Sequence, residues 1–136
     1  MIESDELRSI EELLTNFAWH ADRGEGAALG ALFAMDAVLT VGGQSHHGPT
    51  QIAADCDRRA SVPGRKVRHV WSNLKVLEQR DGEICTVAIQ LTFEQGSGPA
   101  KTQVRVNDLR DRFVKEADGA WRFAERTIER AMALEF

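Results

Sequence analysis

The chain has 136 residues, enough for one domain with its own hydrophobic core. Hydrophobic residues make up 43% of the sequence and charged residues 28%, which is typical of a globular protein and argues against disorder. The formal net charge is -4, and the sequence contains no long basic run. A nucleic-acid groove or an anionic membrane surface needs positive charge, so neither is expected as a partner.

Two cysteines occur, Cys56 and Cys85, and their spacing fits no metal-binding motif. We interpret both as free thiols in a reducing compartment. The acidic N-terminal segment lacks the basic and then apolar layout of a signal peptide, and no apolar run reaches membrane-spanning length. A cytoplasmic protein is therefore expected.

Helical spacing of apolar residues dominates the first part of the chain. It predicts a helix from Ser4, its expected N-cap, to Arg23, ended by Gly24 and Gly26. A short second helix is predicted from Ala27 to Phe33. The third, from about Gln51 to Arg59, follows Pro49.

The rest of the chain has the two-residue period of strands. The predicted strands are Ala37–Val41, Val67–Gln79, Glu83–Gln95, Lys101–Lys115 and Trp121–Ala131. Asp81-Gly82 predicts a hairpin, Gly96-Ser97-Gly98-Pro99 a loop and Asp118-Gly119 a turn. The expected fold is one α+β domain, residues 1–136, with three helices, one strand inserted among them, and then a four-stranded antiparallel meander. If this sheet curves strongly, a cavity remains between the sheet and the helices.

Two residues are candidates for proton transfer. His69 lies near the start of a long strand, where alternation places it on one face with Trp71 and Asn73. Asp22 lies in the last turn of the first helix, at the edge of the apolar face. Taken singly, the histidine can be an ordinary surface or core residue, and Asp22 a solvated partner of Arg23. Together they suggest a dyad in which the carboxylate orients the imidazole.

Other polar residues give weaker indications. His46-His47 has no nearby carboxylate or cysteine pattern, so we predict no metal site. Arg105, Asn107 and Asp111 share one face of a predicted strand with Leu109 and Phe113. One of these polar groups could reach a pocket, although surface positions are more common.

The order of elements and several short motifs resemble the SnoaL-like branch of the nuclear transport factor 2 superfamily. That group includes ketosteroid isomerase, scytalone dehydratase, limonene epoxide hydrolase and hexachlorocyclohexane dehydrochlorinase. The resemblance extends from about Leu7 to Arg130 and rests on Phe17, Asp22, Ala31-Leu32-Phe33, Asp36-Ala37-Val38, Gly48, Arg68-His69, Asn73, Asp118-Gly119, Trp121-Arg122-Phe123 and Arg126. It implies a cone-shaped, barrel-like fold in which three N-terminal helices pack on a strongly curved, mostly antiparallel sheet around a pocket.

The resemblance also implies a chemistry. Asp22 and His69 match the positions of the dyad in relatives close to scytalone dehydratase and the dehydrochlorinase. His69 would remove a proton from carbon, or assist loss of a leaving group, and Asp22 would orient it. Such reactions need no metal and no organic cofactor. The expected activity is that of a lyase or isomerase acting on a small hydrophobic ring compound, such as a steroid, polyketide or aromatic metabolite.

The chain departs from these relatives at Phe17, where the dehydratases commonly have tyrosine and the dehydrochlorinase has lysine. It contains no tyrosine, so the phenolic proton donor is missing. Elimination, isomerisation or a cyclase-type aldol step remains, with Asn73 or water as the oxyanion partner. The residues expected to contact substrate are Phe17, Phe33, Trp71, Asn73 and Leu109.

Two alternatives stay open. The chain could be a non-catalytic binding or assembly domain of the same fold, because fold does not determine function. Epoxide hydrolysis is a lesser alternative, since it needs a fuller set of polar groups to activate water. The family resemblance further implies a homodimer or homotrimer.

Overall fold

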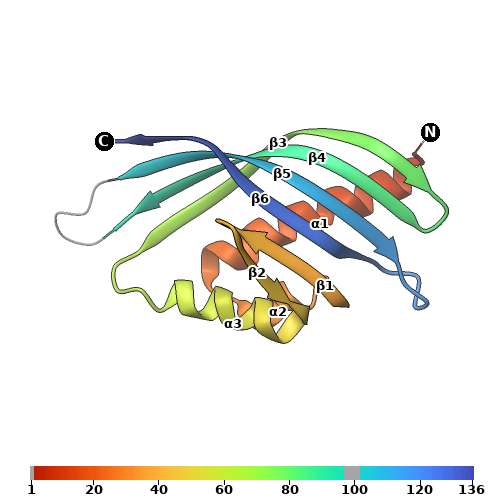
Figure 1. Cartoon of the computed structure of the whole chain (residues 1–136), viewed down its shortest axis with the longest axis horizontal. Helices are drawn as coiled ribbons and strands as arrows, with labels where there is room; N and C mark the ends of the chain where they lie inside the picture. Colours follow the sequence, from red (N-terminus) through yellow and green to blue (C-terminus); the bar gives the residue numbers. More distant parts are fainter. Residues whose placement is uncertain (1, 97–101) are drawn as a thin grey trace.

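The computed structural model describes residues 2–96 and 102–136. Within these residues the chain forms three helices and six strands (Figure 1). They are α1 (Ser4–Arg23), α2 (Gly26–Gly30), β1 (Phe33–Val41), β2 (Gln44–His47), α3 (Gly48–Ala60), β3 (Lys66–Arg80), β4 (Glu83–Gln95), β5 (Gln103–Lys115) and β6 (Trp121–Glu135). The predicted α+β class and the meander of long strands are confirmed.

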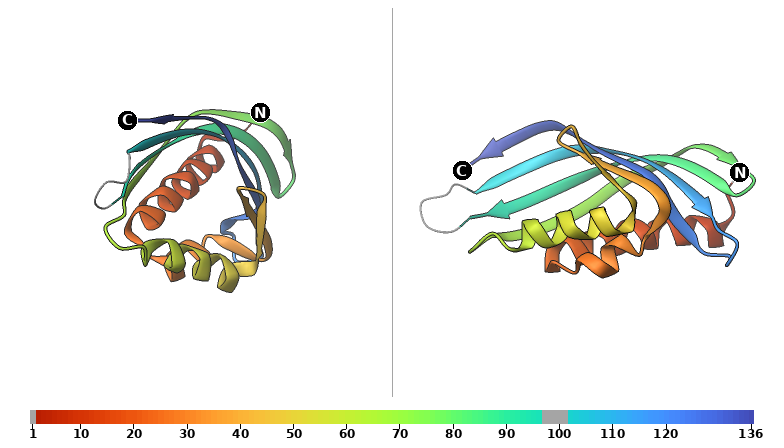
Figure 2. Two further views of the ribbon diagram at one scale, coloured as in Figure 1. Left: turned by 60° about the vertical axis from the view of Figure 1, so that its left-hand side comes forward. Right: turned by 60° about the horizontal axis from the view of Figure 1, so that its bottom comes forward.

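The strands form one mixed sheet in the order β2-β1-β6-β5-β4-β3. In the described part of the chain, β1 pairs with β6 in parallel and every other neighbouring pair is antiparallel. The sheet curves around α1, and all three helices lie on its concave side, so that no helix of the described residues lies on its convex side (Figure 2). This arrangement matches the predicted layers.

The helix α1 has the predicted bounds. Asp5 and Glu6 lie in its first turn, where the helix dipole favours negative charge. Gly24 ends the helix in the left-handed conformation, with φ of 66°. One correction concerns its start: the N-cap is Glu3 rather than Ser4, and no side chain caps the helix.

Several other boundaries differ from the prediction. The second helix ends at Gly30. Phe33 already belongs to β1, because the backbone of Phe33 pairs with that of Phe123 in β6. The strand β2 was not predicted; its histidines pair with β1 where a loop was expected. The predicted loop at residues 97–99 and the predicted strand start at Lys101 lie outside the described residues.

The alternation along β4 separates two faces of the sheet. Cys85, Val87, Ile89, Leu91 and Phe93 share one face as predicted, but this is the more exposed face. The buried face carries Ile84, Thr86, Ala88, Gln90 and Thr92. The concave side of the sheet therefore brings polar side chains into the interior.

An aromatic cluster fills the space between α1 and the sheet. Phe33 stacks on Phe123 with ring centroids 4.8 Å apart, and Phe113 lies at the same distance from Phe123. Phe17 meets Phe33 and Phe123 edge to face. Such a dense cluster is a packed core rather than a cavity.

No helix in the described part of the chain is long and apolar enough to cross a membrane. Cys56 is buried and Cys85 partly buried, and both are free thiols. Burial raises the pKa of each thiol, so both remain protonated near neutral pH.

Candidate active site

Asp22 and His69 meet in the structure. Asp22 comes from the last turn of α1 and His69 from the start of β3. The Oδ1 atom of Asp22 lies 2.7 Å from the Nδ1 atom of His69 and also accepts the backbone N–H of His69 at 2.9 Å. Both side chains are largely shielded from solvent, with 6% of the Asp22 side chain exposed and 14% of the His69 side chain.

This contact assigns the proton on the imidazole ring. A carboxylate accepts hydrogen bonds, so Nδ1 of His69 is the protonated ring nitrogen. In the neutral ring the lone pair is then on Nε2. A carboxylate near the C-terminal end of a helix is disfavoured by the dipole, and the two donors of His69 compensate for this cost. Such an arrangement is the one that an oriented base requires.

His69 lines a cavity of about 750 Å³ between the sheet and the helices. This volume lies within the usual range for sites that bind small molecules. The floor includes buried polar side chains from β4 and β5, namely Gln90, Thr92 and Asn107. In the described part of the chain, none of the three has a side-chain hydrogen bond, which leaves these groups available to a ligand.

Strand register places these groups beside the histidine. His69 pairs with Thr92, and Thr92 with Arg105, so the three side chains form one row across β3, β4 and β5. In the adjacent row Gln90 pairs with Asn107. Directly opposed residues on neighbouring strands have Cβ atoms about 5 Å apart. The polar groups of both rows therefore lie on the same cavity wall as His69.

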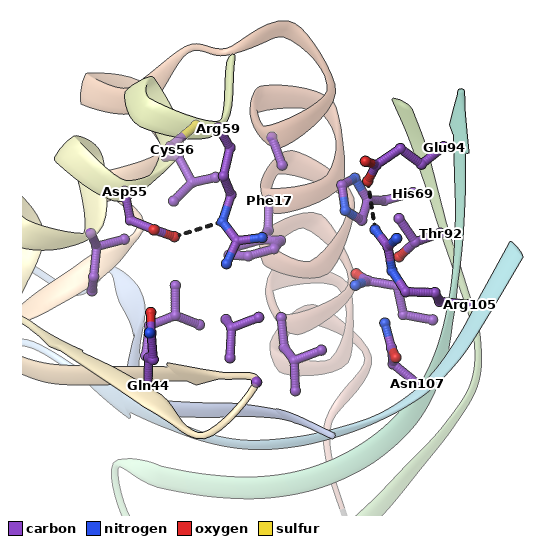
Figure 3. Close-up of a pocket in the computed structure, with 18 of the residues that line it drawn as sticks. Phe17, Gln44, Asp55, Cys56, Arg59, His69, Thr92, Glu94, Arg105 and Asn107 are labelled. Atoms are coloured by element: carbon purple, nitrogen blue, oxygen red, sulfur yellow. Dashed lines mark hydrogen bonds and ion pairs between the residues drawn. The ribbon is translucent and has the colours of Figure 1, made fainter. Parts of the chain in front are cut away.

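Two arginine–carboxylate clusters face the cavity (Figure 3). On α3, Asp55 accepts hydrogen bonds from Arg58 and Arg59. Burial opposes ionisation of Asp55, but these hydrogen bonds outweigh it and hold the pKa of Asp55 below its usual value. His46 of β2 also approaches Asp55, with Nε2 3.7 Å from Oδ1.

The second cluster is on the sheet side. Glu94 of β4 accepts hydrogen bonds from Arg105 at 2.7 Å and from Arg65 at 3.3 Å. Burial again opposes ionisation, and the two guanidinium groups nevertheless hold the pKa of Glu94 below its usual value. The carboxylates of both clusters are therefore charged at neutral pH.

A buried ion pair lies deeper in the cone. Arg126 Nε is 3.4 Å from Asp111 Oδ1, and both side chains are fully buried. The guanidinium carbon of Arg126 is 4.2 Å from the ring centroid of Phe17. Phe17 lines the cavity, whereas Arg126 does not. The phenylalanine that replaces the expected tyrosine thus contacts this cation.

Of the residues predicted to contact substrate, only some line the cavity. Phe17 lines it, but Phe33 and Leu109 are buried in the hydrophobic core outside the lining. Trp71 is absent from the lining, and its indole N–H donates to the Thr15 hydroxyl. None of these three residues lines the cavity, and their contact with a substrate stays a prediction.

Asn73 does not lie beside His69 in the cavity lining, where strand alternation predicted it. Its φ is 57°, and the register of β3 shifts between Ser72 and Lys75. This irregularity interrupts the alternation that was assumed to run on from His69, and Asn73 is exposed. Among the described residues, the amides that line the cavity are instead those of Gln44, Gln90 and Asn107.

The family model described as a SnoaL-like domain matches residues 3–127. The chain belongs to the SnoaL-like domain family. The predicted resemblance is therefore confirmed. No curated protein matches the sequence.

Solved structures share the fold of this SnoaL-like chain at low identity. A protein from Novosphingobium aromaticivorans DSM 12444, provisionally named scytalone dehydratase, is 20% identical, with a TM-score of 0.85 over 96% of this chain and 87% of its own. The hexachlorocyclohexane dehydrochlorinase LinA type 2 is 16% identical, with a TM-score of 0.83 over 95% and 87%. ActVI-ORFA from Streptomyces coelicolor is 16% identical, with a TM-score of 0.78 over 92% and 96%. These likenesses show a common fold of the nuclear transport factor 2 type.

Proposed function

We propose that this SnoaL-like chain is a cofactor-independent lyase or isomerase that removes a proton from carbon. The observation that carries the proposal is the Asp22–His69 contact at the wall of the cavity. A buried carboxylate that fixes the Nδ1–H tautomer leaves Nε2 of His69 as the base, and it stabilises the imidazolium that forms.

The proposed reaction has two possible continuations. His69 Nε2 takes the proton, and the electron pair of the broken C–H bond forms a new double bond. In an elimination, a leaving group on the neighbouring carbon departs with its own bonding pair. In an isomerisation, the π pair of a neighbouring carbonyl moves onto its oxygen. When the carbonyl forms again, the carbon–carbon double bond shifts and another carbon takes the proton back from the imidazolium. The unpaired groups of Gln90, Thr92 and Asn107 are suited to receive the developing negative oxygen.

The substrate class proposed here is a small hydrophobic ring compound. Apolar residues share the lining with the polar groups, among them Phe17, Leu29, Leu39, Ile52 and Ile128. Two structural relatives bear the names of a dehydratase and a dehydrochlorinase, which are both eliminating enzymes. Their names favour elimination as the first reaction to test.

The experiment measures proton abstraction directly. The purified protein is incubated in D₂O with enolisable ring ketones, and with chlorinated and hydroxylated rings that can eliminate. Deuterium incorporation, chloride release and dehydration are then followed by NMR. We expect acceleration with at least one compound, its loss in His69→Gln, and its retention in His47→Gln, a control at an exposed histidine of β2.

A non-catalytic binding domain is the alternative function. If rates in the wild type and in His69→Gln are equal for all compounds, the proposal of an enzyme is wrong and the binding domain is favoured. A binding domain has no need of an oriented base, which is why the dyad supports the enzyme instead.

We further propose that the chain forms a homodimer or homotrimer through the convex side of the sheet. Val70, Leu91, Val106 and Met132 form one cross-strand row there, and Phe93, Val104 and Leu134 lie in the next. Among residues 2–96 and 102–136, no helix covers this side (Figure 2). Apolar rows of this kind are typical of subunit interfaces.

A further inference from the structure

The cavity lining carries more positive than negative side chains, although the protein as a whole is acidic. Among the described lining residues are five arginines and two carboxylates, Asp55 and Glu94. The formal net charge of the chain is -4. Each carboxylate is shared by two arginines, so each cluster retains one positive charge. A concave, partly desolvated surface with a positive excess attracts anions.

Arg59 is the arginine whose donors are best placed for a ligand. Its Nε atom donates to Asp55 Oδ2 at 2.9 Å. In the described part of the chain, its two terminal nitrogens have no partner. A guanidinium group has five N–H donors, so its outer edge is free to bind a planar anion through two parallel hydrogen bonds. The side chain is 39% exposed, and its guanidinium group points into the cavity (Figure 3).

Asp55 holds this guanidinium group in position. The carboxylate is buried, and its Oδ1 atom is bound by Arg58, which leaves Oδ2 for Arg59. An arginine with a fixed head loses little conformational entropy when it binds an anion. Asp55 is thus a positioning residue for Arg59.

The other lining arginines fit this role less well. Arg105 uses both terminal nitrogens on Gln103 and Glu94, and Arg65 uses one of its two on Glu94, so neither keeps the pair of terminal nitrogens for a ligand. Arg58 and Arg130 are exposed. Arg59 therefore combines a fixed position with free donors, and it lies on the α3 side of the cavity, away from the sheet that carries His69 (Figure 3).

We propose that the cavity selects ring compounds that bear a carboxylate, and that Arg59 binds this carboxylate through its outer edge. A ligand held in this way presents its far side to His69, so Arg59 is a specificity-determining residue for the reaction. The placement of the reacting carbon rests on the proposed function, whereas recognition of the acid does not depend on catalysis.

The test compares matched acids and amides. Benzoate, naphthoate and anthracene carboxylate, and the primary amide of each, are titrated into the protein in a calorimeter at low ionic strength. We expect the wild type to bind at least one acid about tenfold more tightly than its amide, as a charge-assisted bidentate contact implies. This preference disappears in Arg59→Gln and is intermediate in Arg59→Lys, which keeps the charge without the fork.

A matched control removes an arginine from elsewhere. Arg110 lies on the exposed face of β5, outside the cavity, so Arg110→Gln keeps the preference for acids. Circular dichroism verifies that each variant is folded. If no acid in the wild type binds better than its amide, or if Arg59→Gln retains the preference, the proposal is overturned.

The outcome is separable from the proposed function. Asp22→Ala and His69→Gln should retain the preference for acids even though they remove turnover. A protein that prefers acids without accelerating proton exchange would be an acid-binding domain. If the protein accelerates proton exchange but shows no preference for acids, the role proposed for the dyad stands and the role proposed for Arg59 is wrong.

Discussion

The carboxylate of Asp22 joins two elements of the fold through a single oxygen. Its Oδ1 atom accepts both the backbone N–H and the ring Nδ1–H of His69, a residue 47 positions later in the chain. The contact therefore fastens the end of α1 to the start of β3 and orients the imidazole at the same time. Substitutions of Asp22 should separate these two effects.

Asp22→Asn keeps an oxygen acceptor and removes the charge. We expect the variant to fold and to lose proton-abstraction activity by about a hundredfold or more, because an amide does not stabilise the imidazolium. Asp22→Ala removes the acceptor as well, and should also lower the free energy of unfolding by about 1–3 kcal/mol. Exchange rates in D₂O and urea denaturation measure the two quantities. Full activity in Asp22→Asn would contradict the role given to the carboxylate.

Phe17 links the cavity to the core. Its ring contacts Phe33, Phe123 and the guanidinium group of Arg126. Phe17→Ala should lower the free energy of unfolding by about 3–5 kcal/mol, as is usual for a buried aromatic residue. Phe136→Ala, at a residue that is 75% exposed and lies outside the proposed interface rows, is the control and should cost much less. Similar losses in the two variants would argue against a tightly packed Phe17.

The buried pair Asp111–Arg126 predicts a dependence of stability on pH. Burial raises the pKa of Asp111 from its ordinary 3.8 to about 6, although the charge of Arg126 opposes the shift. From about pH 4 to 6 the folded protein therefore holds a proton that the unfolded chain releases. The free energy of unfolding should fall as the pH rises through this window, by about 3 kcal/mol.

Asp111→Asn has no ionisable side chain at this position, so a comparison of the wild type with this variant isolates the effect of the Asp111 proton. Asp55 and Glu94, whose lowered pKa values act in the opposite direction, are present in both proteins and cancel in the comparison. Urea denaturation at several pH values should show the wild type losing stability relative to Asp111→Asn as the pH rises. A difference that stays constant would mean that Asp111 is ionised throughout the window.

The convex side of the sheet provides the test of assembly. Met132 is 57% exposed at the end of the row with Val70, Leu91 and Val106. Met132→Lys should weaken the proposed dimer or trimer with little effect on the folded subunit. Met35, which is 83% exposed on β1, provides the control Met35→Lys. Sedimentation velocity distinguishes the species, and a monomeric wild type would refute the proposed oligomer.

Much of the fold follows from local signals in the sequence. The bounds of α1 and β4 are those that the apolar periodicities predict, since both elements have long, regular patterns. The parallel pairing of β1 with β6 and the short strand β2 depend on contacts between distant segments. Periodicity within a segment carries no information about such pairing.

The site was harder to predict than the fold. Asp22 and His69 stand out in the sequence by position and chemistry. The placement of Asn73 could not be predicted, because strict alternation does not indicate the irregularity of β3 at this residue. Arg59 was missed because a helix surface rich in charge usually faces solvent. The spacing of Asp55 with Arg59, four residues apart on α3, was the available signal.

The tautomer of His69 tests the central claim most directly. Nitrogen-15 NMR of the imidazole ring distinguishes a proton on Nδ1 from one on Nε2, and assignment by His69→Gln identifies the signal. In the neutral ring of the wild type we expect the proton on Nδ1. In Asp22→Ala the ring should no longer prefer Nδ1 over Nε2. A proton on Nε2 of the wild-type ring, or a tautomer unaffected by Asp22→Ala, would contradict the oriented base.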